Sequence, residues 1–395
     1  MKTNFFKHQA QTSPYPLALQ ISHANGAYVY DSNQKEYLDF IAGVSANTLG
    51  HNHPAISKAI KDQVDKYTHV MVYGEFIQKP QVAICSLLAK NLPKNLETVY
   101  LTNSGTEATE GALKLAKRFT GRSVIIAAKN GYHGNTQGSM SVCGAEEQNS
   151  AFRPLVPGIK FIEFNNTVDL DKITTNTAGV ILETIQGGAG FIEPKNNYLQ
   201  KVLDKCNEVG ALLILDEIQS GIGRTGKLFG FQNYITSPHI VVTGKGLGGG
   251  MPIGAFISSF EIMSCLQQQP KLGHITTFGG HPVIAAAANA TLEKLLNSNL
   301  IEESLAKEKL IRKLLVHPLI TEIRGKGLML AVMVETSEIA SKVILKSLEK
   351  GLLLYWLLFE GRAVRISPPL TITEDEIYKG CNIIIEVLNE VLAEY

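Results

Sequence analysis

The 395-residue sequence lacks several features that would assign a protein early to a functional class. Lys and Arg number 37 against 36 Asp and Glu, for a formal charge of +1, and this balance indicates no nucleic-acid or anionic membrane partner. Five scattered cysteines without CxxC spacing are typical of thiols in a reducing compartment, rather than of a disulfide framework or zinc site. The longest apolar run, Leu352–Phe359, is too short to cross a bilayer, and residues 1–16 contain no continuous apolar signal segment. We therefore expect a soluble cytoplasmic protein with no metal.

From about residue 51 to residue 285, short apolar runs alternate with helical segments, a pattern that predicts an α/β fold with a largely parallel sheet. The expected strands are Thr98–Thr102, Val124–Ala128, Lys160–Phe164, Gly179–Glu183, Leu212–Asp216, Ile240–Thr243 and Ile253–Ser258. Residues 286–395 indicate a smaller α+β domain, and we expect residues 1–50 to pack with it. The predicted organisation is thus a large domain at 51–285 flanked by these two segments.

Two of these runs each end in a charged residue. Asp216 follows the run Ala211–Leu215, and Lys245 follows Ile240–Thr243 after one glycine. Ligands of open parallel sheets bind at the carboxyl ends of the strands, so we expect the acid and the amine to share a site. Side chains two positions apart lie on one face of a strand, which predicts Asp216 and Ile218 on the same side. A carboxylate beside an aliphatic side chain suits a flat aromatic ring with a basic nitrogen.

Other motifs in the chain match their patterns only in part. Gly221–Lys227 nearly fits a P-loop, but Leu228 stands where Ser or Thr would bind magnesium. This segment and Gly244–Gly249 also fit G-x-G-x-x-G, but neither precedes the long amphipathic helix of a dinucleotide fold. His51 and His53 lack a third ligand at usable spacing. We therefore expect neither nucleotide nor metal binding.

The segments that contain Asp216 and Lys245 resemble the DE-x-Q-x-G-x-G-R-T-G-K and G-K-x-L-G-G-G motifs of the class-III aminotransferases. These are pyridoxal-phosphate (PLP) enzymes related to acetylornithine, ornithine and 4-aminobutyrate aminotransferases. The resemblance extends from about Tyr15 to the C-terminal helix, and it implies a fold-type-I PLP transferase whose large domain carries a mainly parallel seven-stranded sheet. It also implies that Lys245 forms the Schiff base with pyridoxal 5'-phosphate, while Asp216 keeps the pyridine nitrogen protonated.

The resemblance assigns further residues to the phosphate of the cofactor. Ser104, Gly105 and Thr106 belong to an NSGT turn at a helix N-terminus, where free N–H groups favour an anion. Thr276 and Thr277 match a family threonine that reaches the phosphate bound in the other subunit. We therefore expect a homodimer with shared active sites.

The ring of the cofactor has its own expected contacts. Tyr132, in the GYHG segment, resembles the family aromatic residue that stacks on the ring. Ile218 would pack on the ring face, and Gln219 would hydrogen-bond the ring hydroxyl. Glu183, in ETIQG, matches a family acid near the same site.

The residues expected to bind substrate depart from the family pattern. Arg365 matches the family's substrate arginine, which can hold a carboxylate bidentately, although an interface salt bridge is the alternative. Asn135 and Gly188 stand where ornithine, acetylornithine and 4-aminobutyrate enzymes carry an arginine and a glutamate, and Val44 stands where a tyrosine contacts ornithine. These differences predict an altered pocket, in which Arg365 alone holds the substrate carboxylate and the far end of the substrate is less charged.

The expected activity is a ping-pong transfer of an amino group between an amino acid or amine and a 2-oxo acid. An aminomutase or racemase would keep Asp216 and Lys245 but consume no external keto acid. A non-catalytic homologue that acts as a binding protein is a more remote alternative. The sequence does not name the donor, the acceptor or the pathway.

Overall fold

The apolar runs of the central segment form a seven-stranded sheet in the computed structural model, which describes residues 1–72, 74–235 and 237–394. The strand order is β4-β10-β9-β8-β7-β5-β6. The strands are Thr98–Thr102 (β4), Val124–Ala128 (β5), Ile159–Ile162 (β6), Thr177–Glu183 (β7), Leu212–Asp216 (β8), Ile240–Gly244 (β9) and Gly254–Ser258 (β10). Each matches a predicted strand to within two residues at either end. β10 is antiparallel to both of its neighbours, and the other pairings are parallel.

Side chains of the sheet alternate between two apolar cores. In β8, Leu212 and Ile214 belong to the core that includes α5 (Gly105–Thr120), whereas Leu213 and Leu215 belong to the core on the opposite face. Strands that are buried on both faces read as continuous apolar runs, which is why the sequence pattern was so clear. Because β7, β8 and β9 are parallel neighbours, their carboxyl ends lie at one edge of the sheet.

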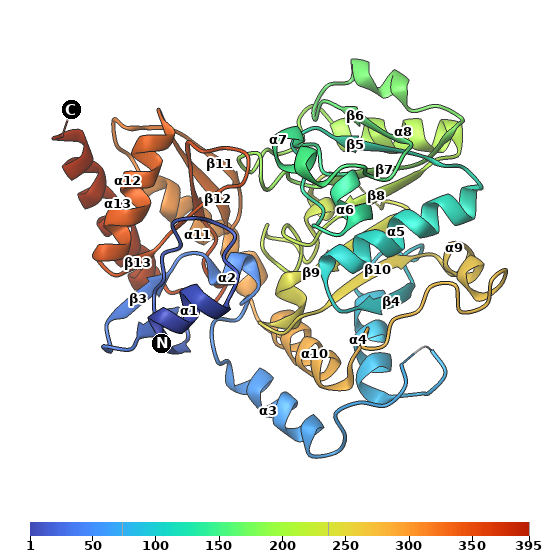
Figure 1. The fold of residues 1–395 in the computed structure, drawn as a ribbon, viewed down its shortest axis with the longest axis horizontal. Helices are drawn as coiled ribbons and strands as arrows, with labels where there is room; N and C mark the ends of the chain where they lie inside the picture. The colour runs from blue at the N-terminus through green and yellow to red at the C-terminus, as the bar shows by residue number, and fades with distance from the viewer. Residues whose placement is uncertain (73, 236, 395) are drawn as a thin grey trace.

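Helix α5 crosses one face of this sheet (Figure 1). Its apolar face is buried at Ala108, Ala112, Leu115 and Ala116, but Phe119, near the end of the helix, is 39% exposed. The other helices of this lobe are α3 (Pro54–Val64), α4 (Lys79–Lys90), α6 (Gln137–Ser141), α7 (Glu146–Asn149), α8 (Tyr198–Val209), α9 (Phe260–Ser264) and α10 (Pro282–Leu296).

The second lobe combines the two ends of the chain, as the blue and red segments of Figure 1 show. One sheet has the order β1-β2-β3-β13, and the other has the order β11-β12-β15-β14. Their strands are Ile21–Asn25 (β1), Tyr28–Asp31 (β2), Glu36–Asp39 (β3), Ile320–Lys326 (β11), Met329–Val334 (β12), Leu352–Leu353 (β13), Tyr355–Trp356 (β14) and Ala363–Ile366 (β15). The helical elements are α1 (Lys2–His8), α2 (Ala42–Ser45), α11 (Leu300–Leu314), α12 (Ser337–Glu349) and α13 (Glu374–Leu392). The domain boundary near residue 285 stays a prediction; it falls within α10, which packs against α3 and α4.

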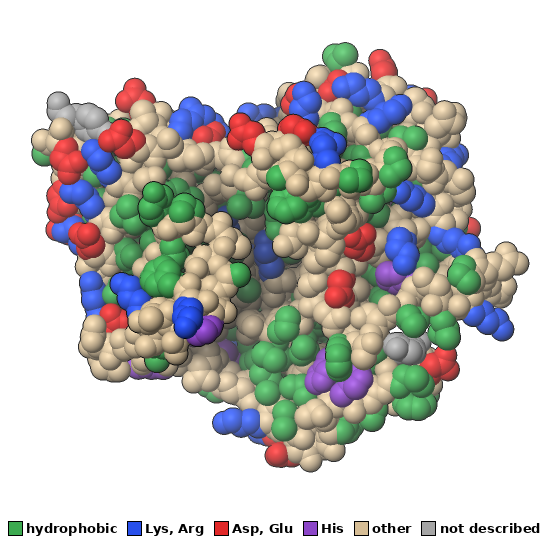
Figure 2. All heavy atoms as spheres, viewed as in Figure 1, with side chains coloured by type: hydrophobic (Ala, Val, Ile, Leu, Met, Phe, Trp, Pro, Cys, Tyr) green, Lys and Arg blue, Asp and Glu red, His purple; other side chains and the backbone are tan. Residues whose placement is uncertain are grey.

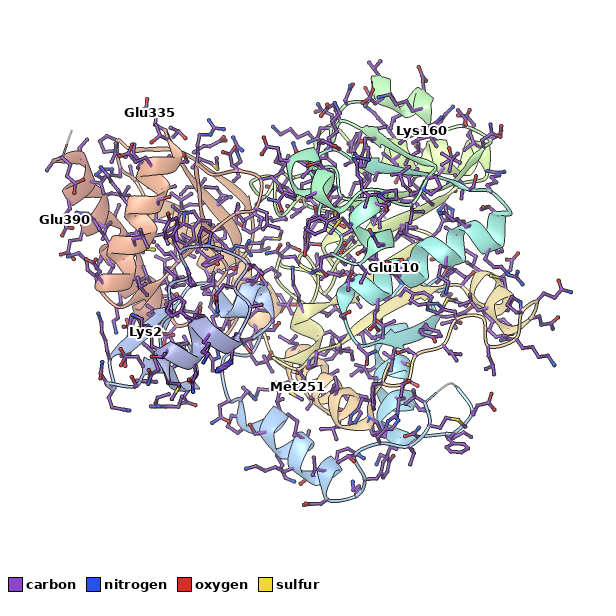
Figure 3. All side chains as sticks on the ribbon, viewed as in Figure 1. Lys2, Glu110, Lys160, Met251, Glu335 and Glu390 are labelled. Atoms are coloured by element: carbon purple, nitrogen blue, oxygen red, sulfur yellow. The ribbon has the colours of Figure 1, made fainter. Side chains whose placement is uncertain are left out.

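Helix α13 begins with a capping box formed by Thr373 and Glu376. Its buried face belongs to the main core, and glutamates along its solvent edge pair with Lys346 of α12 and with Lys350, directly after α12. Figure 3 shows one of these glutamates, Glu390, on the outer side of the lobe. Exposed pairs of this kind contribute about 0–1 kcal/mol each, so the apolar face contributes most of the docking energy.

Within the described ranges, no helix combines the length and apolar character needed to span a bilayer. Nor do the described His, Cys, Asp and Glu side chains gather in a group that could hold a metal ion. His51 Nε2 lies 2.7 Å from Asp39 Oδ2, and His53 Nδ1 accepts from the N–H of Ala55 at the start of α3.

Candidate active site

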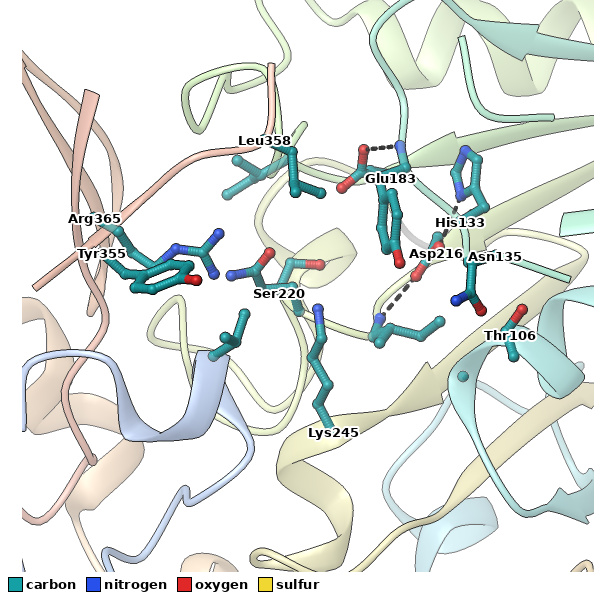
Figure 4. Close-up of a pocket in the computed structure, with 18 of the residues that line it drawn as sticks. Thr106, His133, Asn135, Glu183, Asp216, Ser220, Lys245, Tyr355, Leu358 and Arg365 are labelled. Atoms are coloured by element: carbon teal, nitrogen blue, oxygen red, sulfur yellow. Dashed lines mark hydrogen bonds and ion pairs between the residues drawn. The ribbon is translucent and has the colours of Figure 1, made fainter. Parts of the chain in front are cut away.

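A cavity of about 400 Å³ lies between the two lobes, and Figure 2 shows the surface hollowed there. Most of the predicted site residues line it, although they come from segments far apart in the chain. These lining residues are Val44, Gly105, Thr106, Tyr132, Asn135, Glu183, Asp216, Ile218, Gln219, Lys245 and Arg365. Asp216, His133, Asn135 and Thr106 lie on one side of the cavity, Arg365 and Tyr355 lie on the other, and Lys245 lies between the two groups (Figure 4).

Asp216 is the last residue of β8, and its side chain is 4% exposed. Its Oδ1 accepts from the N–H of Ile218 at 2.9 Å, and its Oδ2 lies 2.8 Å from His133 Nδ1. These two bonds hold the carboxylate in one orientation. Because the strand ends at Asp216, Ile218 reaches the cavity from the following turn and not by the strand alternation expected from sequence.

Glu183 is the neighbour of Asp216 in the parallel pairing of β7 with β8. It accepts hydrogen bonds from the N–H groups of Tyr132 and Gly187, each at 2.9 Å. Burial raises the pKa of Glu183 to about 7, and the charge of Asp216 adds to that shift while the two backbone bonds oppose it. The bond to Tyr132 fixes the loop that brings this tyrosine to the cavity wall.

Lys245 stands directly after β9 and begins the short helical turn η4 (Lys245–Gly248) with a φ of 39°. Burial lowers the pKa of Lys245 to about 8, and the positive charge of Arg365 lowers it further, while Asp216 and Glu183 act in the opposite direction. A lysine with this pKa has a neutral fraction near physiological pH, so its amine can act as a nucleophile or a base. The next residue must be glycine, because a Cβ on Gly246 would lie 2.4 Å from Thr48 Oγ1.

The N-terminus of α5 closes the cavity on the large-lobe side. Ser104 is the N-cap residue, and its Oγ accepts from the N–H of Glu107 at 3.3 Å. Gly105 and Thr106 line the cavity, whereas Ser104 does not. A Cβ on Gly105 would lie 2.6 Å from Ile218 Cδ1, so glycine permits this close approach. Backbone N–H groups at a helix N-terminus have no intrahelical partner and favour an anion such as phosphate.

Arg365 lies on β15, which is the neighbour of both β12 and β14, and it is 5% exposed. Its guanidinium lies 5.9 Å from the ring centre of Phe191, and burial lowers the pKa of Arg365 to about 10. Among the described residues, its buried Nε and Nη1 atoms have no hydrogen-bond partner and no carboxylate forms a salt bridge with it. Two unsatisfied donors at the wall of a cavity suit an anionic ligand.

Gly188 and Asn135 lie on the cavity wall, as their family positions require. A Cβ on Gly188 would lie 2.8 Å from Phe359 Cδ2, and the carbonyl of Gly188 accepts from the N–H of Phe359. The space that a glutamate would need is therefore occupied by Phe359.

The wall segment Ala42–Ser45, labelled α2 in Figure 1, is a turn of left-handed helix. Its φ angles are 46°, 58°, 59° and 66° in order, and Val44, the third residue, lines the cavity. A left-handed conformation costs about 1–2 kcal/mol for each residue other than glycine. Val44 is the least suited to it, because it is β-branched.

Thr276 and Thr277 do not line the cavity of the single chain. Thr276 Oγ1 accepts from Nδ2 of Asn103 at 3.0 Å, next to the start of α5, and Thr277 is exposed. Both therefore lie outside the cavity of the single chain.

Sequence reasoning missed several residues of the cavity. His133 is in the quoted GYHG segment, but nothing in the pattern indicated its bond to Asp216. The other missed lining residues are Ile185, Ser220, Tyr355, Trp356 and Leu358. Tyr355 and Trp356 belong to the run Leu352–Phe359, whose apolar character hid two short strands.

The two glycine-rich segments, Gly221–Lys227 and Gly244–Gly249, each lead into or contain a short turn. Lys227 is followed by the short turn η3 (Gly230–Asn233), and no long helix follows η4 either. Arg224 is fully buried and donates to the carbonyls of Leu328 and Pro368. The motif Gly221–Lys227 thus joins the two lobes.

A helix N-terminus that can accept an anion, a buried carboxylate and a cavity-facing lysine of lowered pKa suit the binding of PLP. The chain belongs to the class-III aminotransferase family, whose model matches residues 9–388. It is 38% identical to the acetylornithine aminotransferase of Methanopyrus kandleri, over 94% of each chain. The protein is therefore a PLP-dependent aminotransferase that uses an amino donor and a 2-oxo acid acceptor.

Solved structures show the same fold. The ornithine aminotransferase of Toxoplasma gondii has a TM-score of 0.91 at 31% identity, with 100% of this chain and 96% of that chain covered. The adenosylmethionine-8-amino-7-oxononanoate aminotransferase of Methanocaldococcus jannaschii has a TM-score of 0.90 at 30% identity, with 98% of each chain covered. These similarities confirm the predicted fold class and, with the family match, favour the aminotransferase over the two alternative functions.

Proposed function

We propose that this aminotransferase acts on donors whose carboxylate is held by Arg365 and whose far end carries no charge. The observation that carries the proposal is the state of Arg365, whose buried Nε and Nη1 face no acceptor among the described residues. Phe359 occupies the space where a competing glutamate at position 188 would stand. The remaining wall residues Val44, Tyr355 and Leu358 offer no charge to a second ionised group.

The described residues fit the cofactor. Gly105 and Thr106 would hold its phosphate, Tyr132 and Ile218 would enclose its ring, and Asp216 would hold its ring nitrogen in the protonated form. When bound, PLP supplies an aldehyde for the amine and a ring that withdraws electrons from the substrate carbon. In this proposal Gln219 would hydrogen-bond the ring hydroxyl, Glu183 fixes the backbone at Tyr132, and Ser104 caps α5.

Lys245 is proposed to hold the cofactor covalently and to move the substrate proton once a donor amine has taken its place. The low pKa of its amine suits both tasks, since the amine must be neutral to attack and to accept a proton. Asp216 acts through its fixed orientation, and His133, which also lines the cavity, maintains that orientation through its bond to Oδ2 of Asp216. Arg365 positions the donor between these groups.

A panel of amino acids and amines, each assayed with pyruvate and with 2-oxoglutarate, tests the substrate proposal. We expect turnover of uncharged amino acids to exceed that of ornithine or 4-aminobutyrate. The Arg365→Ala variant should have a KM for carboxylate donors that is roughly 10–100-fold higher. This increase corresponds to the loss of a charged hydrogen-bonded pair that contributes ~1.5–3 kcal/mol to binding. The Arg362→Ala variant is the control, because Arg362 precedes the same strand but pairs with Glu360 at the surface. Strong ornithine or 4-aminobutyrate turnover would contradict the proposal.

We also propose a homodimer with shared active sites. An apolar surface on the large lobe includes Met71, Phe76, Ile77 and Phe278, of which Ile77 is 95% exposed. Figure 2 shows hydrophobic and histidine side chains gathered on the lower part of this lobe. Monomers rarely expose such a patch, and it lies beside Thr276 and Thr277 in the chain. A second copy seated there would bring these threonines to the neighbouring cavity.

Light scattering after gel filtration tests the oligomer. We expect the wild-type chain to have twice the monomer mass and Ile77→Asp to shift it toward monomer with loss of activity. Phe152→Asp, at an exposed position on the same lobe, should change neither. A monomeric, fully active wild type would exclude the shared site.

A further inference from the structure

The left-handed turn that presents Val44 to the cavity depends on a buried carboxylate outside the cavity. Asp39, at the end of β3, is 2% exposed and is not among the lining residues. Its Oδ1 accepts from the N–H groups of Ile41 and Ala42 at 2.8 and 2.9 Å. These are the two residues at which the chain enters the left-handed turn. The carboxylate therefore stabilises a backbone conformation that residues other than glycine adopt only rarely.

His51 holds the other oxygen of this carboxylate. Its Nε2 lies 2.7 Å from Asp39 Oδ2, and the backbone of His51 exchanges two hydrogen bonds with Gly26 of the N-terminal sheet. Because the backbone of His51 is held by Gly26, its imidazole restricts the orientation of the Asp39 carboxylate. With both oxygens engaged, the carboxylate has little freedom to rotate away from the turn.

The same short segment is bonded to Ser367, the residue directly after the strand that contains Arg365. The carbonyl of Phe40 accepts from the N–H of Ser367 at 2.7 Å, and the carbonyl of Ile41 accepts from Ser367 Oγ at 3.4 Å. Arg224, which donates to the carbonyl of Pro368, is close enough for the charge of Asp39 to oppose the fall in its pKa. Residues 39–42 therefore connect the wall at Val44 to the segment that follows Arg365.

We propose that Asp39, oriented by His51, is a positioning residue that sets the separation between Val44 and Arg365 and thereby the length of donor that the cavity accepts. This inference rests on the proposed function, in which Arg365 holds the donor carboxylate. Asp39 touches neither substrate nor cofactor. It acts by holding the left-handed turn in place, so that the far end of the donor meets Val44 at a fixed distance from the guanidinium.

The test compares Asp39→Asn with a matched control, Asp31→Asn. Asp31 lies in β2 of the same sheet, is buried, and likewise accepts from two backbone N–H groups, those of Asn33 and Lys35. It does not contact the turn at residues 42–45. Both variants lose one anionic acceptor in a tight turn, so a merely structural effect should be similar in the two.

The measured quantity is the ratio of kcat/KM for the shortest and the longest carboxylate donors that the wild-type holoenzyme accepts. We expect Asp39→Asn to change this ratio by about tenfold or more, since a displacement near 1 Å can cost up to a hundredfold. His51→Gln should change it in the same direction but by less. Asp31→Asn should leave the ratio unchanged, and in all three variants the visible absorbance of the bound cofactor should be retained.

An unchanged ratio in folded Asp39→Asn, or an equal change in Asp31→Asn, would overturn the proposal. Should Asp39→Asn fail to fold, His51→Gln decides by the same criterion. If Arg365 does not hold the donor carboxylate, the Arg365→Ala variant will show an unaltered KM for carboxylate donors, and this result is distinct from the result for Asp39. The donor-length ratio tests Asp39 separately, since both donors carry the same carboxylate.

Discussion

On the large-lobe side of the cavity, the key side chains come from the ends of neighbouring strands, whereas on the small-lobe side they come from segments more than three hundred residues apart. Glu183 and Asp216 are the last residues of β7 and β8, Lys245 directly follows β9, and these three strands are adjacent in the sheet. Val44 follows β3 and Arg365 lies on β15, and the two residues line the same cavity because the two sheets of the second lobe pack together. The first arrangement follows from strand order, and the second depends on long-range packing. We therefore expect the large-lobe half to determine the chemistry and the small-lobe half to determine the substrate.

The largest expected effect is in the large-lobe half. Lys245→Ala removes the only amine that lines the cavity among the described residues, and we expect kcat to fall by at least about 10⁴-fold for every donor. Single-turnover kinetics with the cofactor added would measure it. Donor-selective loss would contradict the division of roles between the two halves.

Asp216→Asn should lower kcat by about 10²–10³-fold, because a neutral amide cannot keep the ring nitrogen protonated. The loss should again be the same for short and long donors. His133→Asn, which changes only the orientation of Asp216, should lose less activity than Asp216→Asn. Steady-state kinetics of both variants, with the cofactor absorbance as a check on occupancy, would test this ranking.

Gly188→Glu changes the small-lobe half. The new side chain must displace Phe359, and its carboxylate would lie in the same cavity as Arg365. We expect KM for carboxylate donors to rise by roughly tenfold, which is ~1.4 kcal/mol, with a smaller change in kcat. Gly188→Ala separates the steric effect from the charge. Equal KM values in the two variants would show that the charge plays no part.

The smallest expected effect is a shift in the pH profile of Lys245, whose pKa depends on the charge of Arg365 in the other half of the cavity. The pKa of Lys245 is lowered to about 8, partly by the charge of Arg365. The rate at which cofactor-free protein captures PLP requires the neutral amine, so it should rise with pH and level off above about 8. Arg365→Ala removes a positive charge, raises the pKa of Lys245 and should move the profile to higher pH. Arg362→Ala should leave the profile in place, and a shift to lower pH in Arg365→Ala would contradict the assignment.

The strands of the large lobe could be located from sequence more readily than those of the small lobe, because the former follow from local patterns and the latter from long-range packing. Buried parallel strands leave continuous apolar runs, so all seven strands of the large sheet were located from sequence, although the antiparallel direction of β10 was not. In the small lobe, β13 and β14 have two residues each, and β13 pairs with β3 far away in the chain, whereas β14 pairs with the nearby β15. No local pattern specifies such pairings.

The sequence by itself predicted that an acid and an amine at the ends of two buried strands share one edge of a parallel sheet, and the resemblance of their motifs to the class-III aminotransferases implied the class of chemistry. It also identified Gly188 and Asn135 as departures from the family pattern. Only the tertiary structure decided that Phe359 occupies the space beside Gly188, that His133 orients Asp216, and that a left-handed turn presents Val44. These features arise from contacts between residues distant in sequence, and their energies depend on packing that exists only in the folded chain.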